Sequence, residues 1–335
     1  MVFCPLPADR RRARLLFQLA YAPLLWALFA CEGGPPQAPT DYEAQASYLF
    51  EHMGDDGDEA LRAGLTELRR WLEADSARQS ALLSGYQVNQ LEASAVAQLT
   101  ERAYTTDNLL GVSVLTKSPH RVEALMGALT MEDFNQVIQL PLYERSFDKD
   151  PSCFPTRSCL ILEAESYQES RWGELIPMSI KNKVRFRWVE TESGWVALQQ
   201  RWLLEPTAGP FLGTEIEMRE SYYLGINWYD EGGETPPQAP GVRAAANGLA
   251  SGGGETLQRL EETLRNPGAL RFHVTWFETD YGAVSNVFPP EKAMNLLLDS
   301  LKADAQRLDE WINKGDGELE GSTGDQRTEE ERADD

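Results

Sequence analysis

The sequence predicts an α+β protein in which a curved antiparallel sheet wraps around one long C-terminal helix, with a helical extension at the N-terminus. Between residues 159 and 278 apolar side chains recur with a period of two, which is typical of antiparallel strands that turn one face toward a core. From Pro289 to Ile312 they recur at steps of three and four, which is typical of an amphipathic helix. Such a helix would be roughly 34 Å long, long enough to cross a sheet.

The first 30 residues have the features of an export signal. Four arginines, at positions 10, 11, 12 and 14, precede an apolar segment over residues 15–30. That segment is shorter than the ~20 residues that a membrane-spanning helix needs. We therefore expect residues 1–30 to be a signal peptide, and an uncleaved membrane anchor is the alternative.

The end of this segment, Leu28-Phe29-Ala30-Cys31, resembles the lipobox of bacterial lipoproteins, although Phe29 is bulkier than the usual residue. The resemblance implies that Cys31 becomes the first residue of the mature protein and carries acyl chains such as palmitate, followed by a flexible tether over residues 31–40. Several acyl chains together hold a protein stably on a membrane. The expected location is the bacterial cell envelope, at the outer membrane and facing the periplasm or the cell surface.

Composition limits the partners and cofactors. The net charge of −22 disfavours nucleic acid as a partner. Cys153 and Cys159 lie in a turn-rich segment, so in an oxidising compartment we expect them to form a disulfide. No histidine or second cysteine pair stands near them to complete a zinc site, so no metal and no cofactor are predicted.

Residues 41–105 form the predicted N-terminal helical region. Apolar residues share one face in Asp41–Met53 and again in Asp58–Glu73, with a glycine-containing break between the two segments. A third helix is expected over Gln90–Arg102. The periodicity of these segments indicates contact with a core and carries no information about chemistry.

The main domain is expected over residues 106–314, and it opens with a strand and two short helices. Gly111–Thr116 is a β-branched run typical of a strand. Ser118 followed by Pro119 predicts a capped helix that continues to Ala128. A second short helix is expected from Met131 to Gln139.

The rest of the sheet is predicted from five further stretches with a period of two. Phe186 and Trp188 alternate with Lys183, Arg185 and Arg187, and Ser193-Gly194 fits a tight turn. The predicted strands are Leu160–Tyr167, Lys183–Trp188, Val196–Leu204, Ile216–Trp228 and Leu270–Glu278. This alternation favours a sheet with one face in the core and one face in water.

Two segments are expected to be irregular. Residues 230–254 are rich in glycine, proline and alanine, so they are expected to form either a flexible insertion or a functional lid. Residues 315–335 carry nine acidic residues and two arginines, a composition typical of a disordered tail.

The order of elements resembles that of the START-like, or SRPBCC, helix-grip superfamily across residues 109–313. The segment from Val112 to Leu125, with Asp133-Phe134-Asn135 after it, is similar to the opening of that family, and Phe288-Pro-Pro-Glu-Lys-Ala-Met294 with the long helix is similar to its close. The resemblance implies a cavity between the sheet and the last helix for sterols, lipids or other apolar ligands.

Under this resemblance the aromatic face of the sheet is expected to point toward the last helix. The candidate cavity residues are Trp188, Gln200, Trp202, Glu220, Tyr222, Trp228, Phe272, Trp276, Met294 and Leu298. Aromatic rings can line a cavity or fill it, so a solid core is the alternative. Leu297, Leu301 and Leu308 are expected to be buried against the sheet.

Glu220 is the best single candidate for a ligand-orienting or acid–base group, because a carboxylate on an apolar face is costly unless it is paired or protonated. The alternative is that the strand bulges there and Glu220 reaches solvent. His52, His120 and His273 are far apart in the sequence, with His273 on the expected wet side of a strand. No nucleophile elbow, zinc-binding helix or phosphate loop occurs, so no catalytic residues are predicted.

The leading hypothesis is therefore an exported, membrane-anchored lipoprotein that binds a lipid or other hydrophobic small molecule without catalysing a reaction. One alternative is a structural or partner-binding envelope lipoprotein with a filled core, whose protein partner the sequence does not identify. A second alternative is a cyclase- or aromatase-like enzyme of the same fold.

Overall fold

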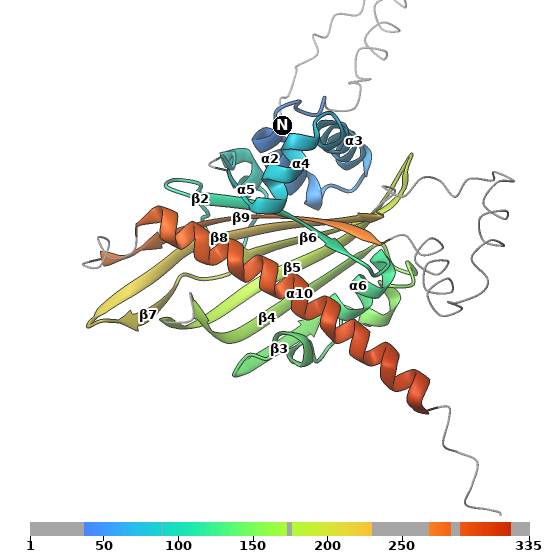
Figure 1. Cartoon of the computed structure of the whole chain (residues 1–335). Coiled ribbons are helices and arrows are strands. Elements are labelled where there is room, and N and C mark those ends of the chain that lie inside the picture. Colours follow the sequence, from blue (N-terminus) through green and yellow to red (C-terminus); the bar gives the residue numbers. More distant parts are fainter. Residues whose placement is uncertain (1–36, 89, 173–175, 230–267, 283–288, 323–335) are drawn as a thin grey trace, which may run out of the picture. The chain divides into compact units, whose positions relative to one another are not determined.

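The computed structural model describes residues 37–88, 90–172, 176–229, 268–282 and 289–322. Within these ranges the chain is an α+β protein with a curved, unclosed antiparallel sheet and a long C-terminal helix (Figure 1). The chain divides into the units Met1–Gln37 and Ala38–Asp335, and every described helix and strand belongs to the second. The predicted signal peptide, Cys31 and the predicted insertion over residues 230–254 lie outside the described residues.

The helices and strands are as follows. The helices are α2 (Tyr42–Glu51), η1 (His52–Gly54), α3 (Glu59–Glu73), α4 (Ser76–Ser84), α5 (Ala93–Ala97), α6 (Val122–Leu129), α7 (Asn135–Ile138), η2 (Pro151–Cys153) and α10 (Pro290–Ser322). The strands are β1 (Tyr86–Val88), β2 (Leu110–Ser118), β3 (Leu142–Phe147), β4 (Ile161–Trp172), β5 (Ile176–Thr191), β6 (Gly194–Leu203), β7 (Thr207–Phe211), β8 (Thr214–Tyr229) and β9 (Ala269–Asp280).

The strands form one sheet in the order β1-β2-β9-β8-β6-β5-β4-β3, and β7 pairs with β8. All neighbouring pairs are antiparallel. The first strand of the main domain, β2, therefore pairs with the last strand, β9, although about 150 residues of chain separate them. This pairing brings the two ends of the domain together beside the start of α10.

The face that α10 crosses is covered, and the opposite face is covered under the N-terminal helices but exposed along β4 and the start of β5, where Glu165, Glu169 and Lys181 reach water. α10 crosses one face, while α2 and α3 lie on the opposite face (Figure 1). The prediction of a sheet with one wet face is therefore confirmed along β4 and the start of β5, and it is wrong for the strands under the N-terminal helices. The physical reason is that the N-terminal helices have apolar faces of their own, and these faces need a second apolar surface to be removed from water.

The core on the side of the N-terminal helices is built from apolar residues of both layers. Phe50 of α2 packs edge-to-face on Tyr222 and Trp276, at ring-centroid distances of 5.8 and 6.0 Å. Arg187, expected to face water, is instead buried here: its guanidinium binds the carboxylate of Asp58 at 2.6 Å and the carbonyl oxygen of Gly57 at 2.9 Å. The guanidinium thereby holds the turn between α2 and α3 against the sheet.

The core on the side of α10 has three parts, one of which joins Ala293 at the start of the helix to Ile176, Met178 and Phe277. Leu308 and Ile312 are buried with Phe186 and Trp188 in one cluster, beneath the C-terminal half of α10. Nearer the start of the helix, Leu301 packs with Met294, Val112 and Val114, and Leu297 and Leu298 are only partly buried. Leu301 and Leu308 are thus buried as expected, whereas Leu297 is not fully covered.

Several predicted elements differ from those observed. Ser118 belongs to β2 and does not cap α6, whose N-cap position is Arg121. The helix expected over Gln90–Arg102 is limited to the five residues of α5. α10 continues to Ser322, beyond the expected start of the tail at residue 315. Residues 323–335 lie outside the described chain.

Cys153 and Cys159 lie at disulfide-bonding distance, with Cα atoms 5.3 Å apart, as the sequence predicts. The bond closes the loop that follows η2, and Phe154 within this loop is buried against Trp188. The disulfide therefore holds part of the core on the α10 side.

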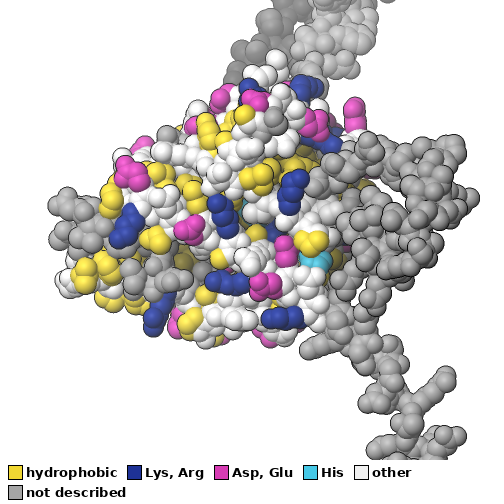
Figure 2. Space-filling view, viewed as in Figure 1, with side chains coloured by type: hydrophobic (Ala, Val, Ile, Leu, Met, Phe, Trp, Pro, Cys, Tyr) yellow, Lys and Arg dark blue, Asp and Glu magenta, His cyan; other side chains and the backbone are white. Residues whose placement is uncertain are grey.

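Charged side chains of both signs are interspersed over the face of the molecule that carries α10, as Figure 2 shows. On α10 itself, Arg307 pairs with Asp304 at 2.9 Å. The large net negative charge of the chain is thus not gathered into a single acidic patch on this face.

Candidate functional site

A group of polar side chains lies on the sheet face that α10 crosses. Strand register places them together: Arg201 pairs with Tyr223, Tyr223 with Thr275, and Asn227 with Arg271. We call this group the polar layer, and it consists of Gln199, Arg201, Tyr223, Asn227, Arg271, His273 and Thr275. All are buried except Arg201, which is half-buried.

These residues alternate with the aromatic residues that the sequence analysis emphasises. Tyr223 follows Tyr222, and His273 follows Phe272, so the side chains of each pair point to opposite faces of the sheet. The apolar residues pack under the N-terminal helices. Their polar neighbours, expected to be in water, are therefore enclosed between the sheet and α10.

Within the polar layer, His273 is held by contacts on both ring nitrogens. Its Nδ1 lies 2.7 Å from the hydroxyl of Tyr223, and its Nε2 lies 3.3 Å from Oγ1 of Thr116 on β2. These contacts link the three strands β2, β9 and β8 at the level where α10 passes over them. The imidazole is thus fixed in position rather than free to rotate.

Arg271 is the most enclosed charge of the layer. Its Nε donates to Oδ1 of Asn227 and its Nη1 donates to the backbone carbonyl of Ala305 on α10, both at 3.3 Å. Among the described residues no carboxylate lies within ion-pair distance of Arg271 or of Arg201. Asp304 and Asp309 of α10 act on Arg271 from a distance, but Asp304 pairs with Arg307 and Asp309 accepts from Ser118.

Burial dominates the electrostatics of this layer. It lowers the pKa of Arg271 and raises the pKa of Tyr223. Burial, and secondarily the charge of Arg271, hold the pKa of His273 well below its usual value. At neutral pH the layer therefore contains a neutral imidazole, a neutral phenol and two guanidinium groups, and its net charge is positive.

The burial of His273 predicts a dependence of stability on pH. Above about pH 6.5 the imidazole of His273 is neutral in both the folded and the unfolded protein, so this group does not lower the free energy of unfolding. Below that pH the unfolded chain takes up a proton that the folded protein resists, so the free energy of unfolding falls by up to about 1.4 kcal/mol per pH unit from this group. Urea unfolding of wild type and His273→Gln between about pH 7 and pH 5 checks this: the variant should show the shallower decline, and equal slopes would contradict it.

Two guanidinium groups without carboxylate partners make the polar layer a candidate site for an anion. A buried unpaired charge is costly, and arginine does not relieve that cost by losing its proton. A carboxylate or phosphate would pair with such guanidiniums through strong charge-assisted hydrogen bonds. Tyr223 belongs both to the polar layer and to an adjoining apolar cluster, whose other members are Val112, Val114, Met294 and Leu301. An apolar surface therefore lies directly beside the candidate anion site.

The candidate cavity residues predicted from the sequence divide between the two faces. The five aromatic residues Trp202, Tyr222, Trp228, Phe272 and Trp276 lie in the core under the N-terminal helices. The prediction that they face Met294, Leu297 and Leu301 of the last helix is therefore wrong. The strands that carry these residues are predicted correctly, but an alternating strand offers two faces, and the one with these five aromatic residues is covered by α2, α3 and α5.

Three other candidates do lie on the α10 side. Met294 belongs to the apolar cluster beside the polar layer, and Leu298 packs against that cluster. Trp188 is on the same face of the sheet but farther along, where its indole N–H donates to the carbonyl of Phe154 at 2.7 Å. Its partner residue across β5 and β6 is Ala197, so it faces away from Leu198 and Trp202.

Gln200 and Glu220 bind the N-terminal region. Gln200 donates to the carbonyl of Phe50 at 2.8 Å. Glu220 follows a bulge in β8, as one alternative anticipated, yet it is buried instead of reaching solvent. Its Oε1 accepts from Arg102 at 2.8 Å, and its Oε2 accepts from Tyr222 at 2.8 Å. Both polar residues thus hold the N-terminal segment to the sheet.

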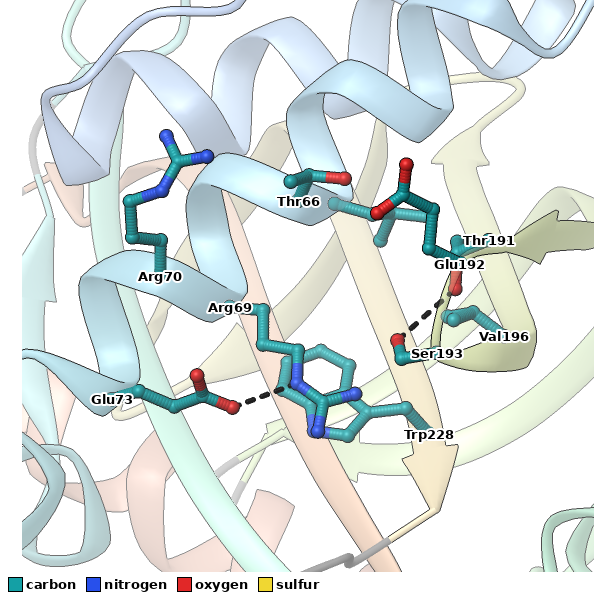
Figure 3. A pocket seen from close by; sticks show the side chains of 10 residues that line it. Thr66, Arg69, Arg70, Glu73, Thr191, Glu192, Ser193, Val196 and Trp228 are labelled. Carbon is teal, nitrogen blue, oxygen red and sulfur yellow. Dashed lines mark hydrogen bonds and ion pairs between the residues drawn. The ribbon is translucent and has the colours of Figure 1, made fainter.

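A pocket of about 260 Å³ lies on the face away from α10, between α3 and the hairpin that joins β5 to β6 (Figure 3). Trp228, a predicted candidate, lines it together with Leu65 and Val196. Figure 3 shows the polar side chains of α3 on one side of this pocket and those of the hairpin on the other.

Sequence reasoning missed Tyr223, Arg201, Arg271 and His273, because polar residues that alternate with apolar ones look solvent-exposed. The available signal was the N-terminal helical region, whose apolar faces require a sheet face of their own. Within the described ranges, no group of three or more His, Cys, Asp and Glu side chains is placed to hold a metal ion. None of the described helices is long and apolar enough to cross a membrane.

Comparison of the sequence with models of protein families and with curated proteins finds no match.

Proposed function

We propose that this protein has the START-like helix-grip fold and that it binds an amphipathic ligand with an anionic group, without catalysis, between the sheet and α10. The order β2, α6, α7, a long antiparallel meander and α10 supports the family resemblance. The observation that carries the ligand proposal is the buried guanidinium of Arg271, which has no carboxylate partner among the described residues.

The surroundings of Arg271 supply the two kinds of contact that an amphipathic ligand needs. Arg201, whose guanidinium carbon lies 5.0 Å from the centre of the Tyr223 ring, adds a second positive charge. The cluster of Val112, Val114 and Met294 offers an apolar surface next to Tyr223. A ligand with an anionic head at the two guanidinium groups and an apolar chain along this cluster would make both kinds of contact. Leu297 and Leu298, which are half-buried beside the cluster, have surface left for such a chain.

The proposed location is the cell envelope, with the protein exported and anchored through acyl chains on Cys31. The basic segment, apolar core and lipobox-like sequence support this part of the proposal. Metabolic labelling with a radioactive fatty acid tests it: wild type should be labelled and Cys31→Ser should not, and equal labelling would refute the anchor.

Binding of matched probes tests the ligand proposal. Calorimetric titration of the full chain with oleate, dodecyl phosphate and uncharged dodecanol should show tight binding of the two anions and weaker binding of the alcohol. Arg271→Met should weaken binding of the anions by about 10-fold or more, the usual loss for a hydrogen bond to a charged group, and leave the alcohol unchanged. Arg219→Met, at an exposed arginine of β8, is the control and should bind like wild type.

A structural or partner-binding role is the second candidate, and the filled aromatic core under the N-terminal helices favours it. Trp202, Tyr222 and Trp276 are almost completely buried there, so the space between α2 and these residues holds side chains and no ligand. If no probe binds and solvent extraction of the purified protein releases no amphipathic molecule, this role replaces ligand binding. Extraction must avoid hydrolysis so that acyl chains attached to Cys31 are not counted.

A further inference from the structure

We propose that the pocket between α3 and the β5–β6 hairpin is a second binding site, separate from the polar layer, and that it takes a neutral saccharide. It lies on the sheet face opposite to α10, so it does not depend on the function proposed above. The pocket combines an apolar floor with a polar rim, and its volume of about 260 Å³ suits one or two sugar rings better than a drug-sized ligand.

The first observation is the indole N–H of Trp228. The buried indoles of Trp188, Trp202 and Trp276 each donate to an oxygen, as tryptophan normally does in a protein interior. Trp228 is 8% exposed and lines the pocket, and its Nε1 donates to no described residue, unlike those three indoles. Since Trp228 lines the pocket, this donor is suited to an oxygen atom of a bound molecule.

The second observation is the charge of the rim. Arg69 pairs with Glu73 at 2.7 Å, and Arg70 pairs with Glu67. Both positive charges are therefore matched within α3, while Glu192 of the hairpin has no ion-pair partner among the described residues. An anionic ligand would meet this unmatched carboxylate, so the rim disfavours anions.

A small cation is also disfavoured. Sites for organic cations enclose the charge with several aromatic rings, and Trp228 is the one aromatic residue that lines the pocket in the described part of the chain. The remaining polar groups of the rim are the hydroxyls of Thr66, Thr191 and Ser193. Thr191 donates to the carbonyl of Gly194 at 2.7 Å and lies 3.2 Å from Ser193, so the oxygen of Ser193 keeps capacity to accept.

A sugar matches this arrangement because each of its hydroxyls both donates and accepts. Ring hydroxyls can accept from Trp228 and donate to Glu192 and Ser193. The C–H face of the ring can then pack on the floor formed by Leu65 and Val196, which are each 6% exposed. A pocket that offers both donors and acceptors, with no net positive charge, is satisfied by a hydroxyl-rich neutral ligand and by few other classes.

Saturation-transfer NMR on the full chain tests the proposal with three neutral sugars, methyl glucoside, N-acetylglucosamine and cellobiose. Glucuronate serves as an anionic comparison ligand and choline as a cationic one. At least one neutral sugar should bind, with a Kd on the order of millimolar. Thr66→Trp adds a large side chain at an exposed pocket position and should abolish this signal without lowering the Tm. Glu192→Gln should weaken binding about 10-fold, the loss of one hydrogen bond to a charged group.

Glu215→Gln, at an exposed glutamate of the β7–β8 hairpin, is the matched control and should bind like wild type. The proposal is overturned if none of the neutral sugars binds, or if Thr66→Trp binds them as well as wild type does. Preferential binding of glucuronate or choline would also overturn it, because the site would then recognise charge. Since oleate and dodecyl phosphate probe the opposite face, failure of either proposal leaves the other intact.

Discussion

Replacing Trp276 by alanine is expected to lower the free energy of unfolding by about 3–5 kcal/mol, the range for removing a large aromatic side chain from a core. Trp276 is completely buried under the N-terminal helices, packs edge-to-face on Phe50 of α2, and donates from its indole N–H to the carbonyl of Gln90 at 2.9 Å. The substitution therefore leaves a cavity and an unpaired carbonyl at the junction of two layers. Urea unfolding followed by circular dichroism measures the loss.

A second measurement shows whether this core joins the helices to the sheet. Phe50→Ala combined with Trp276→Ala should cost less than the two single changes added together, because the rings contact each other. Leu83→Ala, at an exposed position of α4, is the control and should change stability by less than about 0.5 kcal/mol. A loss of that small size for Trp276→Ala would mean that the helices do not cover this face.

Arg102→Ala is expected to cost about 3 kcal/mol, at the lower end of the range for breaking a buried ion pair. Glu220 is 2% exposed, so without the guanidinium its charge would remain buried. The cost stays at the lower end because the amide of Thr105 and the hydroxyl of Tyr222 continue to donate to the carboxylate. Burial and the charge of Glu220 raise the pKa of Tyr222, so that hydroxyl keeps its proton at neutral pH.

The double variant Arg102→Met, Glu220→Met shows whether Arg102→Ala is destabilising because the ion pair is lost or because the carboxylate of Glu220 is left buried without a partner. Removing both charges should recover most of the stability, because the main cost of Arg102→Ala is the unpaired carboxylate. Arg70→Ala breaks an exposed pair on α3 and should cost less than about 1 kcal/mol. If the double variant is less stable than Arg102→Ala, the pair contributes a net attraction and the explanation fails.

Local patterns in the sequence were sufficient for the long elements. α10 and the strands β5, β8 and β9 follow from the periodicity of their own residues, because burial of one stripe or one face repeats every 3.6 or 2 residues. The short elements α4, β1 and β3 were not predicted. β1 has three residues, and it is a strand because Tyr86 pairs with Ser113 of β2, a contact that no local pattern encodes.

Site prediction failed where it depended on the choice between two faces. Glu220 is a buried carboxylate on an apolar face, but its partner Arg102 lies 118 residues away, in a segment that the sequence predicts to be helical. His273 was placed in water because its neighbours Phe272 and Val274 are apolar. Alternation shows that consecutive residues point in opposite directions, and it does not show that the second direction also meets a layer of protein.

The sequence alone therefore determined the class of the fold, the long C-terminal helix and the cysteine pair at 153 and 159, because each depends on contacts between residues near one another or on composition. The tertiary structure alone decided that α2 and α3 take the aromatic face and that α10 takes the polar one. The reason is that the register of β5, β6, β8 and β9 sets which residues share a face, and the apolar face of every helix must then be matched to one of the two. That assignment encloses Arg271 and His273 under α10.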